Sequence, residues 1–233
     1  MQWSGAAAAG VAIAGLVLPP LLTTEAHATE RGEVKLVPLE GGSSVTLNTD
    51  SHLAIRKRGD VRLVELTRGE AYFHIAAGQS PRTDIKLGSH VLRAATGSFA
   101  VRRLADDRSE ITIQRGDLRL EATARDSVPL PQGARIEVGG TRPTVQPMKL
   151  HDIDRALMWR EGKLAFEGET LAEAARSFAR YGGPSILIED AALAAEPVTG
   201  LFASNDPRGF SQAVALALGA RVEARPEGLM ILR

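Results

Sequence analysis

The sequence of 233 residues contains no cysteine, few aromatic residues and no excess of either charge. Without cysteine the chain forms no disulfide bond and no thiolate metal site. Its 28 basic and 28 acidic side chains balance, which argues against a nucleic-acid binder that neutralises phosphates. Because aromatic residues make up only 4% of the chain, alanine and valine must supply much of any core.

Motifs of catalytic and metal sites are also missing. Ser98 follows Gly97, but the second glycine that a nucleophile elbow requires after the serine is absent. The histidines show no metal-ligand spacing; they are His27, His52, His74, His90 and His151. His74 and His90 could lie on neighbouring strands, although solvated strand positions are the simpler interpretation. The sequence therefore predicts a protein that is not an enzyme and binds no cofactor or metal.

Residues 1–28 are predicted to be a signal peptide or a membrane anchor. The first 22 residues carry no charged side chain, and residues 5–22 form an 18-residue segment of about the minimum length for a membrane span. Ala26-His27-Ala28 has the small-x-small pattern of a signal-peptidase site. Cleavage after Ala28 and retention as an anchor both export the rest of the chain. A buried alanine-rich helix is the remaining alternative.

Residues 29–147 have the pattern of many short strands joined by glycine turns. Glycines recur about every 9 to 10 residues from Gly59 to Gly97. Turns are predicted at Arg58-Gly59-Asp60, Arg68-Gly69-Glu70 and Arg115-Gly116-Asp117, because glycine adopts a positive φ there. Residues 89–101 predict further short strands around Gly97. We expect a mainly β, quasi-repetitive domain, solenoid- or sandwich-like. The two RGD tripeptides are better explained by turns than by cell adhesion.

Residues 157–233 predict a small α+β domain built from βαβ repeats, and residues 148–156 a linker to it. Thr170 and Glu173 form a capping box at the start of a helix, and Asp206-Pro207 starts a second helix. Strands are predicted at Ser185–Glu189, Ala220–Arg225 and Leu229–Leu232. The apolar faces of the two helices include Leu171, Ala174, Phe178 and Phe210, Val214, Leu218.

The order of these motifs resembles the exported part of the FecR family, membrane regulators of iron-uptake sigma factors. The matching stretches are VTLNTDSHLAI (45–55), VELTRGEAYFHI (64–75), ATGSFAV (95–101), MWREGKLAFEGETLAEAARSFARYG (158–182) and VTGLFASNDP (198–207). Residues 157–233 are similar to the short signalling domain at the N-terminus of secretins and TonB-dependent receptors. One departure from the family is Ser98, which replaces the usual threonine after Gly97.

The resemblance implies a periplasmic receiver in cell-surface signalling. Such a receiver relays the state of an outer-membrane TonB-dependent receptor, through that receptor's periplasmic signalling domain, to an ECF sigma factor that controls iron-uptake genes. Family members usually hold the sigma factor with a cytoplasmic segment, whereas only four residues precede Gly5 here. We expect anchoring in the inner membrane by the N-terminal segment, or release after cleavage at Ala28. The alternative is an exported envelope or secretion-system assembly protein that uses the same secretin-like domain.

The expected partner contact is a sheet edge, because a neutral surface poor in aromatic residues is not suited to steering by charge. Leu229, Met230, Ile231 and Leu232 end the chain and are predicted to pair with a partner strand if they lie at an edge. The alternative is that this strand is internal.

Overall fold

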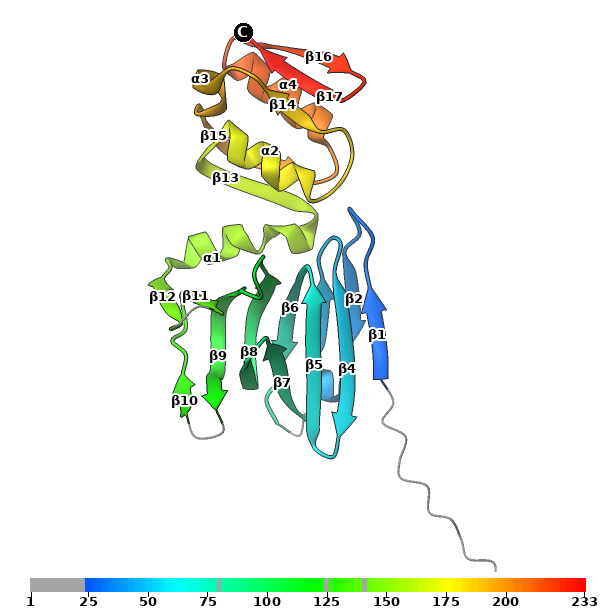
Figure 1. The fold of residues 1–233 in the computed structure, drawn as a ribbon, viewed down its shortest axis with the longest axis vertical. Coiled ribbons are helices and arrows are strands. Elements are labelled where there is room, and N and C mark those ends of the chain that lie inside the picture. Colours follow the sequence, from blue (N-terminus) through cyan, green and yellow to red (C-terminus); the bar gives the residue numbers. More distant parts are fainter. Residues whose placement is uncertain (1–23, 79–80, 124–125, 140–141) are drawn as a thin grey trace, which may run out of the picture.

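The computed structural model describes residues 24–78, 81–123, 126–139 and 142–233 (Figure 1). A β-rich part, the lower part in Figure 1, carries a smaller α+β part at one end, and helix α1 (Leu150–Ala156) lies between them. The start of the first strand and the C-terminus lie at opposite ends of the long axis. The predicted fold class, a β-rich domain followed by a small α+β domain, is confirmed.

The β-rich part consists of one twelve-stranded sheet with a continuous path β1-β4-β5-β7-β8-β6-β3-β2. Strand β9 pairs with β8, β10 and β11, and β11 pairs with β12. Only the β5–β7 ladder is parallel among the described ladders of this sheet. The strands are β1 (Thr24–Ala28), β2 (Lys35–Pro38), β3 (Ser44–Leu47), β4 (His52–Arg58), β5 (Val61–Arg68), β6 (Glu70–Ile75), β7 (Arg82–Leu87), β8 (His90–Arg103), β9 (Ser109–Thr123), β10 (Asp126–Pro129), β11 (Ala134–Val138) and β12 (Thr144–Pro147).

Alternating apolar side chains of these strands form one core, as the period of two along a strand requires. On β5, for example, Val64 and Leu66 are buried whereas Leu63 faces outward. The rings of Phe73 and Phe99 stack in this core with centroids 5.3 Å apart. Leucine and isoleucine supply most of the rest of it, whereas the valine and alanine that the composition favoured contribute fewer residues.

Two of the three predicted glycine turns are confirmed. Gly59 lies between β4 and β5 with φ 58°, and Gly69 lies between β5 and β6 with φ 86°. The third prediction is wrong, because Gly116 lies inside the long strand β9, directly opposite Gly97 of β8. A Cβ atom at Gly116 would lie 2.5 Å from the Gly97 Cα atom. This glycine therefore permits two strands to approach closely at a bulge rather than making a turn. Residues 90–101 belong to one strand rather than several, and Ser89 lies in the turn before it.

The segments expected to flank the domains contain regular structure. Of the predicted leader, residues 1–23 lie outside the described part, whereas Thr24–Ala28 form strand β1, which pairs with β4 over its whole length. Most of the predicted linker, residues 148–156, is helix α1. Among the described helices, none has the length and apolar character needed to cross a membrane.

The α+β part contains two small sheets and the helices that pack on them. Strands β13 and β15 form one sheet, and the other has the order β14-β17-β16. The rings of Phe166, Phe178, Phe202 and Phe210 meet in its core. The elements are η2 (Met158–Glu161), β13 (Lys163–Thr170), α2 (Leu171–Ala179), β14 (Ile186–Ile188), α3 (Ala191–Ala194), β15 (Pro197–Ala203), α4 (Pro207–Ala217), β16 (Arg221–Arg225) and β17 (Gly228–Leu232).

Both predicted helix starts are confirmed. The hydroxyl of Thr170 accepts a hydrogen bond from the backbone N–H of Glu173, whose carboxylate accepts one from the backbone N–H of Thr170. Asp206 caps α4 by accepting from the N–H of Gly209, and Pro207 occupies the first turn.

Candidate functional site

Strand β17, which contains the predicted partner-binding residues, lies in the middle of its sheet. It pairs with β14 in parallel and with β16 antiparallel. Leu229, Met230 and Ile231 are buried, and Leu232 is half-buried. Of the two alternatives, an edge and an internal strand, the structure therefore shows the internal strand. Because both sides of the strand are already paired, its main-chain groups are not free to accept a partner strand.

The outer sides of β14 and β16 are the edges of this sheet, since no other described strand pairs with them. Strand β14 has only three residues, so β16 is the longer edge. Glu223, in the middle of β16, accepts hydrogen bonds from Arg221 and Arg225, and these bonds hold the pKa of its carboxyl below the ordinary value. Charged residues of this kind limit uncontrolled pairing at an edge.

The α+β part rests on the end of the β-rich part through a second cluster of buried residues, here called the junction. Tyr72 of β6 and Ala100 of β8 pack against Leu157, Trp159 and Tyr181. The guanidinium of Arg160 lies over the ring of Tyr72, 4.0 Å from its centroid, a geometry typical of cation–π attraction. The two cores are therefore joined by continuous packing.

A polar network crosses the junction beside this cluster. Glu70, the first residue of β6, accepts a hydrogen bond from an Nη atom of Arg180 at 2.7 Å and another from Nδ2 of Asn48 at 3.0 Å. Asn48 also donates to the hydroxyl of Tyr181, and the hydroxyl of Thr49 donates to the carbonyl of Arg180. Burial lowers the pKa of Arg180, but the ion pair with Glu70 more than offsets this, so the net pKa is raised. The network fixes how the end of α2 lies on the sheet.

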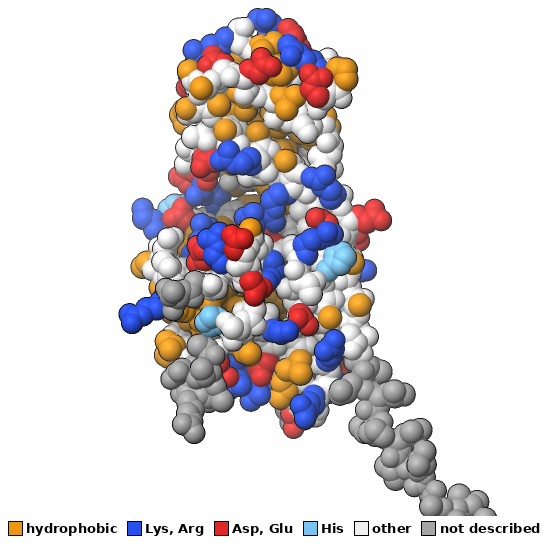
Figure 2. Space-filling model, in the orientation of Figure 1, with side chains coloured by type: hydrophobic (Ala, Val, Ile, Leu, Met, Phe, Trp, Pro, Cys, Tyr) orange, Lys and Arg blue, Asp and Glu red, His pale blue; other side chains and the backbone are white. Residues whose placement is uncertain are grey.

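Two cavities open at the junction and share Arg102 and Arg180. The larger one, here called the arginine cleft, has a volume of about 620 Å³. It is lined by Arg31, Thr49, Asp50, Arg68, Gly69, Arg102, Arg103, Arg176, Ala179 and Arg180. Six arginines thus face a single aspartate in a chain whose net charge is zero. Figure 2 shows basic side chains gathered across the level where the two parts meet.

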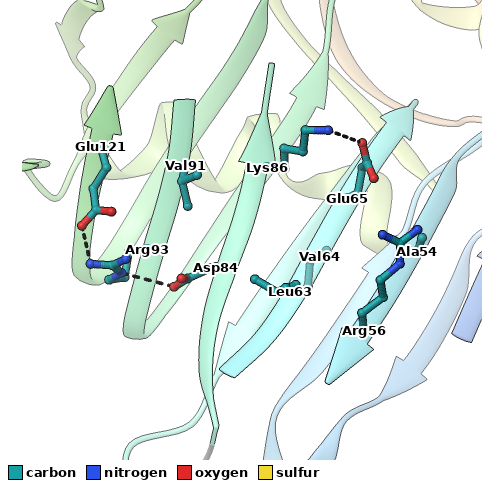
Figure 3. Close-up of a pocket in the computed structure, with 10 residues that line it drawn as sticks. All are labelled: Ala54, Arg56, Leu63, Val64, Glu65, Asp84, Lys86, Val91, Arg93 and Glu121. Atoms are coloured by element: carbon teal, nitrogen blue, oxygen red, sulfur yellow. Dashed lines mark hydrogen bonds and ion pairs between the residues drawn. The ribbon is translucent and has the colours of Figure 1, made fainter. Parts of the chain in front are cut away.

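A third cavity of about 300 Å³ lies on the outer face of the sheet (Figure 3). Its lining includes Leu63, and most of its charged groups pair with one another: Lys86 with Glu65, and Arg93 with both Asp84 and Glu121. Arg56 is the exception, because its guanidinium donates to the hydroxyl of Thr24 and not to a carboxylate of the cavity. Most of the charge in this cavity is therefore already paired.

Among the described residues, two histidines lie close to groups of the kind found in catalytic or metal sites. His74 lies 3.3 Å from the hydroxyl of Ser98, but Ser98 is buried, so a substrate has no access to it. His90 lies at the start of β8, away from His74. His151, Asp152 and Glu167 place ligand atoms within 4.8 Å of one another. Arg155 already contacts both carboxylates and supplies a positive charge there.

Comparison with known proteins identifies the β-rich part. Residues 25–119 match the sequence model of the FecR protein family. The chain carries a FecR domain. This confirms the resemblance for that region and supports a role as a signalling regulator, whereas the secretin-like character of residues 157–233 stays a prediction.

Solved structures show the same fold over most of the chain. Two crystal structures of a proposed anti-sigma factor from Parabacteroides distasonis ATCC 8503, at 2.50 and 1.65 Å resolution, have 18% and 17% sequence identity to this chain and TM-scores of 0.67 and 0.68. The likeness covers 91% and 90% of this chain and 99% of each of those chains. It is therefore a likeness of fold in both parts. Among curated proteins, none matches the chain significantly.

Sequence reasoning missed the junction residues. Glu70 belongs to the predicted turn Arg68-Gly69-Glu70, and Arg180 lies within the predicted helix that starts at Thr170, but they are 110 positions apart. No local pattern relates two such residues. Arg102 lies in a strand with ordinary alternation, so nothing in its neighbourhood indicates a cavity. A buried continuous run, GLMIL at residues 228–232, was a signal that β17 is covered on both faces.

Proposed function

We propose that this FecR-domain chain is a periplasmic receiver in cell-surface signalling. It relays the state of an outer-membrane TonB-dependent receptor toward an ECF sigma factor that controls iron-uptake genes. One structural observation carries the proposal. The start of β1 and the α+β part lie at opposite ends of the molecule, so anchoring through the N-terminal segment points the α+β part away from the inner membrane.

The receptor contact is assigned to the α+β part, which the sequence likens to the signalling domain of secretins and TonB-dependent receptors. Strand β16 is its longer sheet edge. An extended segment of the receptor's periplasmic signalling domain adds to this edge through main-chain hydrogen bonds. Arg221 and Arg225 then determine which partner sequences are accepted, since side chains at an added strand determine specificity.

The position of β1 favours one of the two fates of the N-terminal segment, cleavage after Ala28 or retention as a membrane anchor. Cleavage after Ala28 removes the whole of β1 and leaves the outer side of β4 without a partner strand. Retention of the N-terminal segment in the inner membrane preserves this edge strand, so we favour the anchor over cleavage. The sigma factor is then reached through a cytoplasmic segment of this protein or of a partner.

Calorimetric titration of the isolated periplasmic domain of the receptor into the purified 233-residue chain tests the proposal. Val222→Pro and Glu223→Pro form a matched pair, because neighbouring residues of a strand direct their N–H groups to opposite sides. We expect the proline that removes an N–H on the outer side of β16 to abolish binding while the chain still melts cooperatively. The other proline removes an N–H that bonds to β17, so it should lower the stability of the sheet.

Unchanged binding by every well-folded proline variant rejects the β16 edge. If the unmodified chain shows no binding at all, the receiver hypothesis falls and the alternative of an envelope or secretion-system assembly protein takes its place.

A further inference from the structure

Arg102 has a charged side chain at the junction but no partner for it. On β8 it lies opposite Glu70 of β6 and opposite Glu110 of β9. Glu70 is engaged by Arg180 and Asn48, and Glu110 lies 3.6 Å from Nε of Arg135. Within the described part of the chain, no hydrogen bond or ion pair reaches the guanidinium of Arg102.

The surroundings of Arg102 disfavour its charge. Burial lowers the pKa of this guanidinium, and repulsion from Arg180 lowers it further, against partial opposition from Glu70 and Glu110. A charge that is half-buried and lacks a hydrogen-bond partner costs free energy. An arginine remains protonated in proteins, so the cost is relieved by an added anion rather than by loss of the proton.

Unsatisfied donors surround Arg102 on both sides. The smaller junction cavity, of about 190 Å³, is lined by Arg102, Arg135, Arg155 and Trp159, and also by the acidic residues Glu70, Glu110 and Glu169. Nε1 of Trp159 is buried without a hydrogen-bond acceptor, and this side chain is only 4% exposed. Nε of Arg135 and Nε of Arg155 also form no hydrogen bond, although each lies within ion-pair distance of a carboxylate, that of Glu110 at 3.6 Å and that of Glu167 at 3.8 Å. In the arginine cleft, Nε of Arg103 is also buried without a hydrogen-bond acceptor. Such a set of donors matches an acceptor with negative charge.

The arginine cleft is built from both parts of the molecule. Arg176 and Arg180 come from helix α2 and its C-terminal end, whereas Arg31, Arg68, Arg102 and Arg103 come from the β-rich part. Arg31 already donates to the carbonyl of Ala179 at that helix end. An anion in this cleft therefore touches both parts at once.

We propose that the junction binds an anion with carboxylate or phosphate oxygens, with Arg102 as its principal contact, and that the bound anion ties the α+β part to the β-rich part. Planar guanidinium groups suit both kinds of oxyanion, since they donate two parallel hydrogen bonds. This site is independent of the receptor contact at β16. It makes the orientation of the two parts responsive to a small anion or to an acidic side chain placed there.

The test uses the purified 233-residue chain with two probes, inorganic phosphate and succinate, and sodium chloride at matched ionic strength as the reference. Binding is followed by calorimetry and by the melting temperature, which a ligand of the folded state raises. We expect saturable binding of at least one probe. Phosphate alone or succinate alone identifies the oxyanion class, and binding of both supports a general oxyanion site. Binding of neither probe overturns the proposal.

Arg102→Met separates a binding role from a structural one. Without ligand, this variant is expected to melt at or above the temperature of the unmodified chain, because a half-buried charge without a hydrogen-bond partner is removed. Its affinity for the probe is expected to fall at least about tenfold, the loss of one charge-assisted hydrogen bond. Arg208→Met, which removes an exposed arginine of α4 that lines neither cavity, should bind the probe as the unmodified chain does.

Equal affinity in Arg102→Met and the unmodified chain contradicts the proposal. If Arg102→Met does not fold, Arg102→Lys decides, because lysine keeps the charge but loses the paired donors. Weaker binding by the lysine variant supports the site, and undiminished binding rejects it.

Discussion

Phe178 shows how a chain with few aromatic residues builds a core in its smaller part. The chain has six phenylalanines, and four of them meet in the α+β part. The ring of Phe178 lies with its centroid 4.5 Å from that of Phe210 and 6.3 Å from that of Phe166. Since the remaining core residues there are mostly aliphatic, each ring supplies a large share of the buried apolar surface.

Replacing Phe178 by alanine should therefore destabilise the α+β part strongly. Its side chain is 1% exposed, and loss of such a ring costs about 3 to 5 kcal/mol. Leu216→Ala is the control, because this leucine is 85% exposed and its loss should change the stability by less than about 0.5 kcal/mol. Urea unfolding followed by circular dichroism measures both. A similar loss of unfolding free energy in Phe178→Ala and Leu216→Ala would contradict this account of the core.

At the scale of single elements, the cap at the start of helix α2 contributes to the stability of the α+β part. Thr170→Ala removes the hydroxyl that caps the N–H of Glu173 and should cost about 0.5 to 2 kcal/mol. Hydrogen bonds from the Thr170 backbone and hydroxyl hold the pKa of Glu173 below its ordinary value. This contribution is present above the unfolded pKa, about 4.3, and is lost as the pH falls through the lower folded pKa.

Thermal melts at neutral and acidic pH check this expectation. The difference between the unmodified chain and Thr170→Ala should shrink in acid, whereas Thr170→Ser should remain close to the unmodified chain at both pH values. A difference that is independent of pH would show that Glu173 has no part in the cap.

Elements whose cause is local could be predicted from the sequence. The capping box at Thr170, the proline after Asp206 and the turn glycines 59 and 69 each depend on residues within a few positions. The local signal was ambiguous at Gly116, because a positive φ serves a bulge as well as a turn. Its partner Gly97 is 19 positions away, so only the pairing of β8 with β9 distinguishes the two.

Strand order could not be predicted in the same way. Strand β17 lies beside β14, with two helices and two strands between them in the sequence. Whether the last strand of a chain enters the middle of a sheet depends on packing among distant elements. The uninterrupted apolar run of β17 favoured a buried position, and the position of β17 at the chain end argued only weakly for an edge.

At the scale of the whole molecule, the junction determines how the two parts are oriented. The carboxylate of Glu70 faces Arg180 across it, and Arg102 and Arg180 repel each other. Glu70 pairs with Arg180 and, through its charge, opposes part of the repulsion between the two guanidinium groups. The sequence could not indicate this arrangement, because it arises only when β6, β8 and the end of α2 are brought together.

Glu70→Ala should loosen the junction while both cores remain folded. Breaking a buried pair costs up to about 3 to 5 kcal/mol, and less here because the side chain of Arg180 is 29% exposed. Since the chain has no cysteine, the pair Arg58→Cys and Leu216→Cys provides two unique exposed labelling sites, one in each part. Pulsed electron resonance should show a broader distance distribution in Glu70→Ala than in the doubly labelled parent.

Two companion variants make the result specific. Arg180→Met combined with Glu70→Ala removes both charges, so the distribution should narrow again relative to Glu70→Ala alone. Lys86→Met breaks an exposed ion pair with Glu65 on the sheet and should leave the distribution unchanged. If Glu70→Ala gives the same distance distribution as the parent, the apolar cluster around Trp159 alone holds the two parts, and the polar network has no part in their orientation.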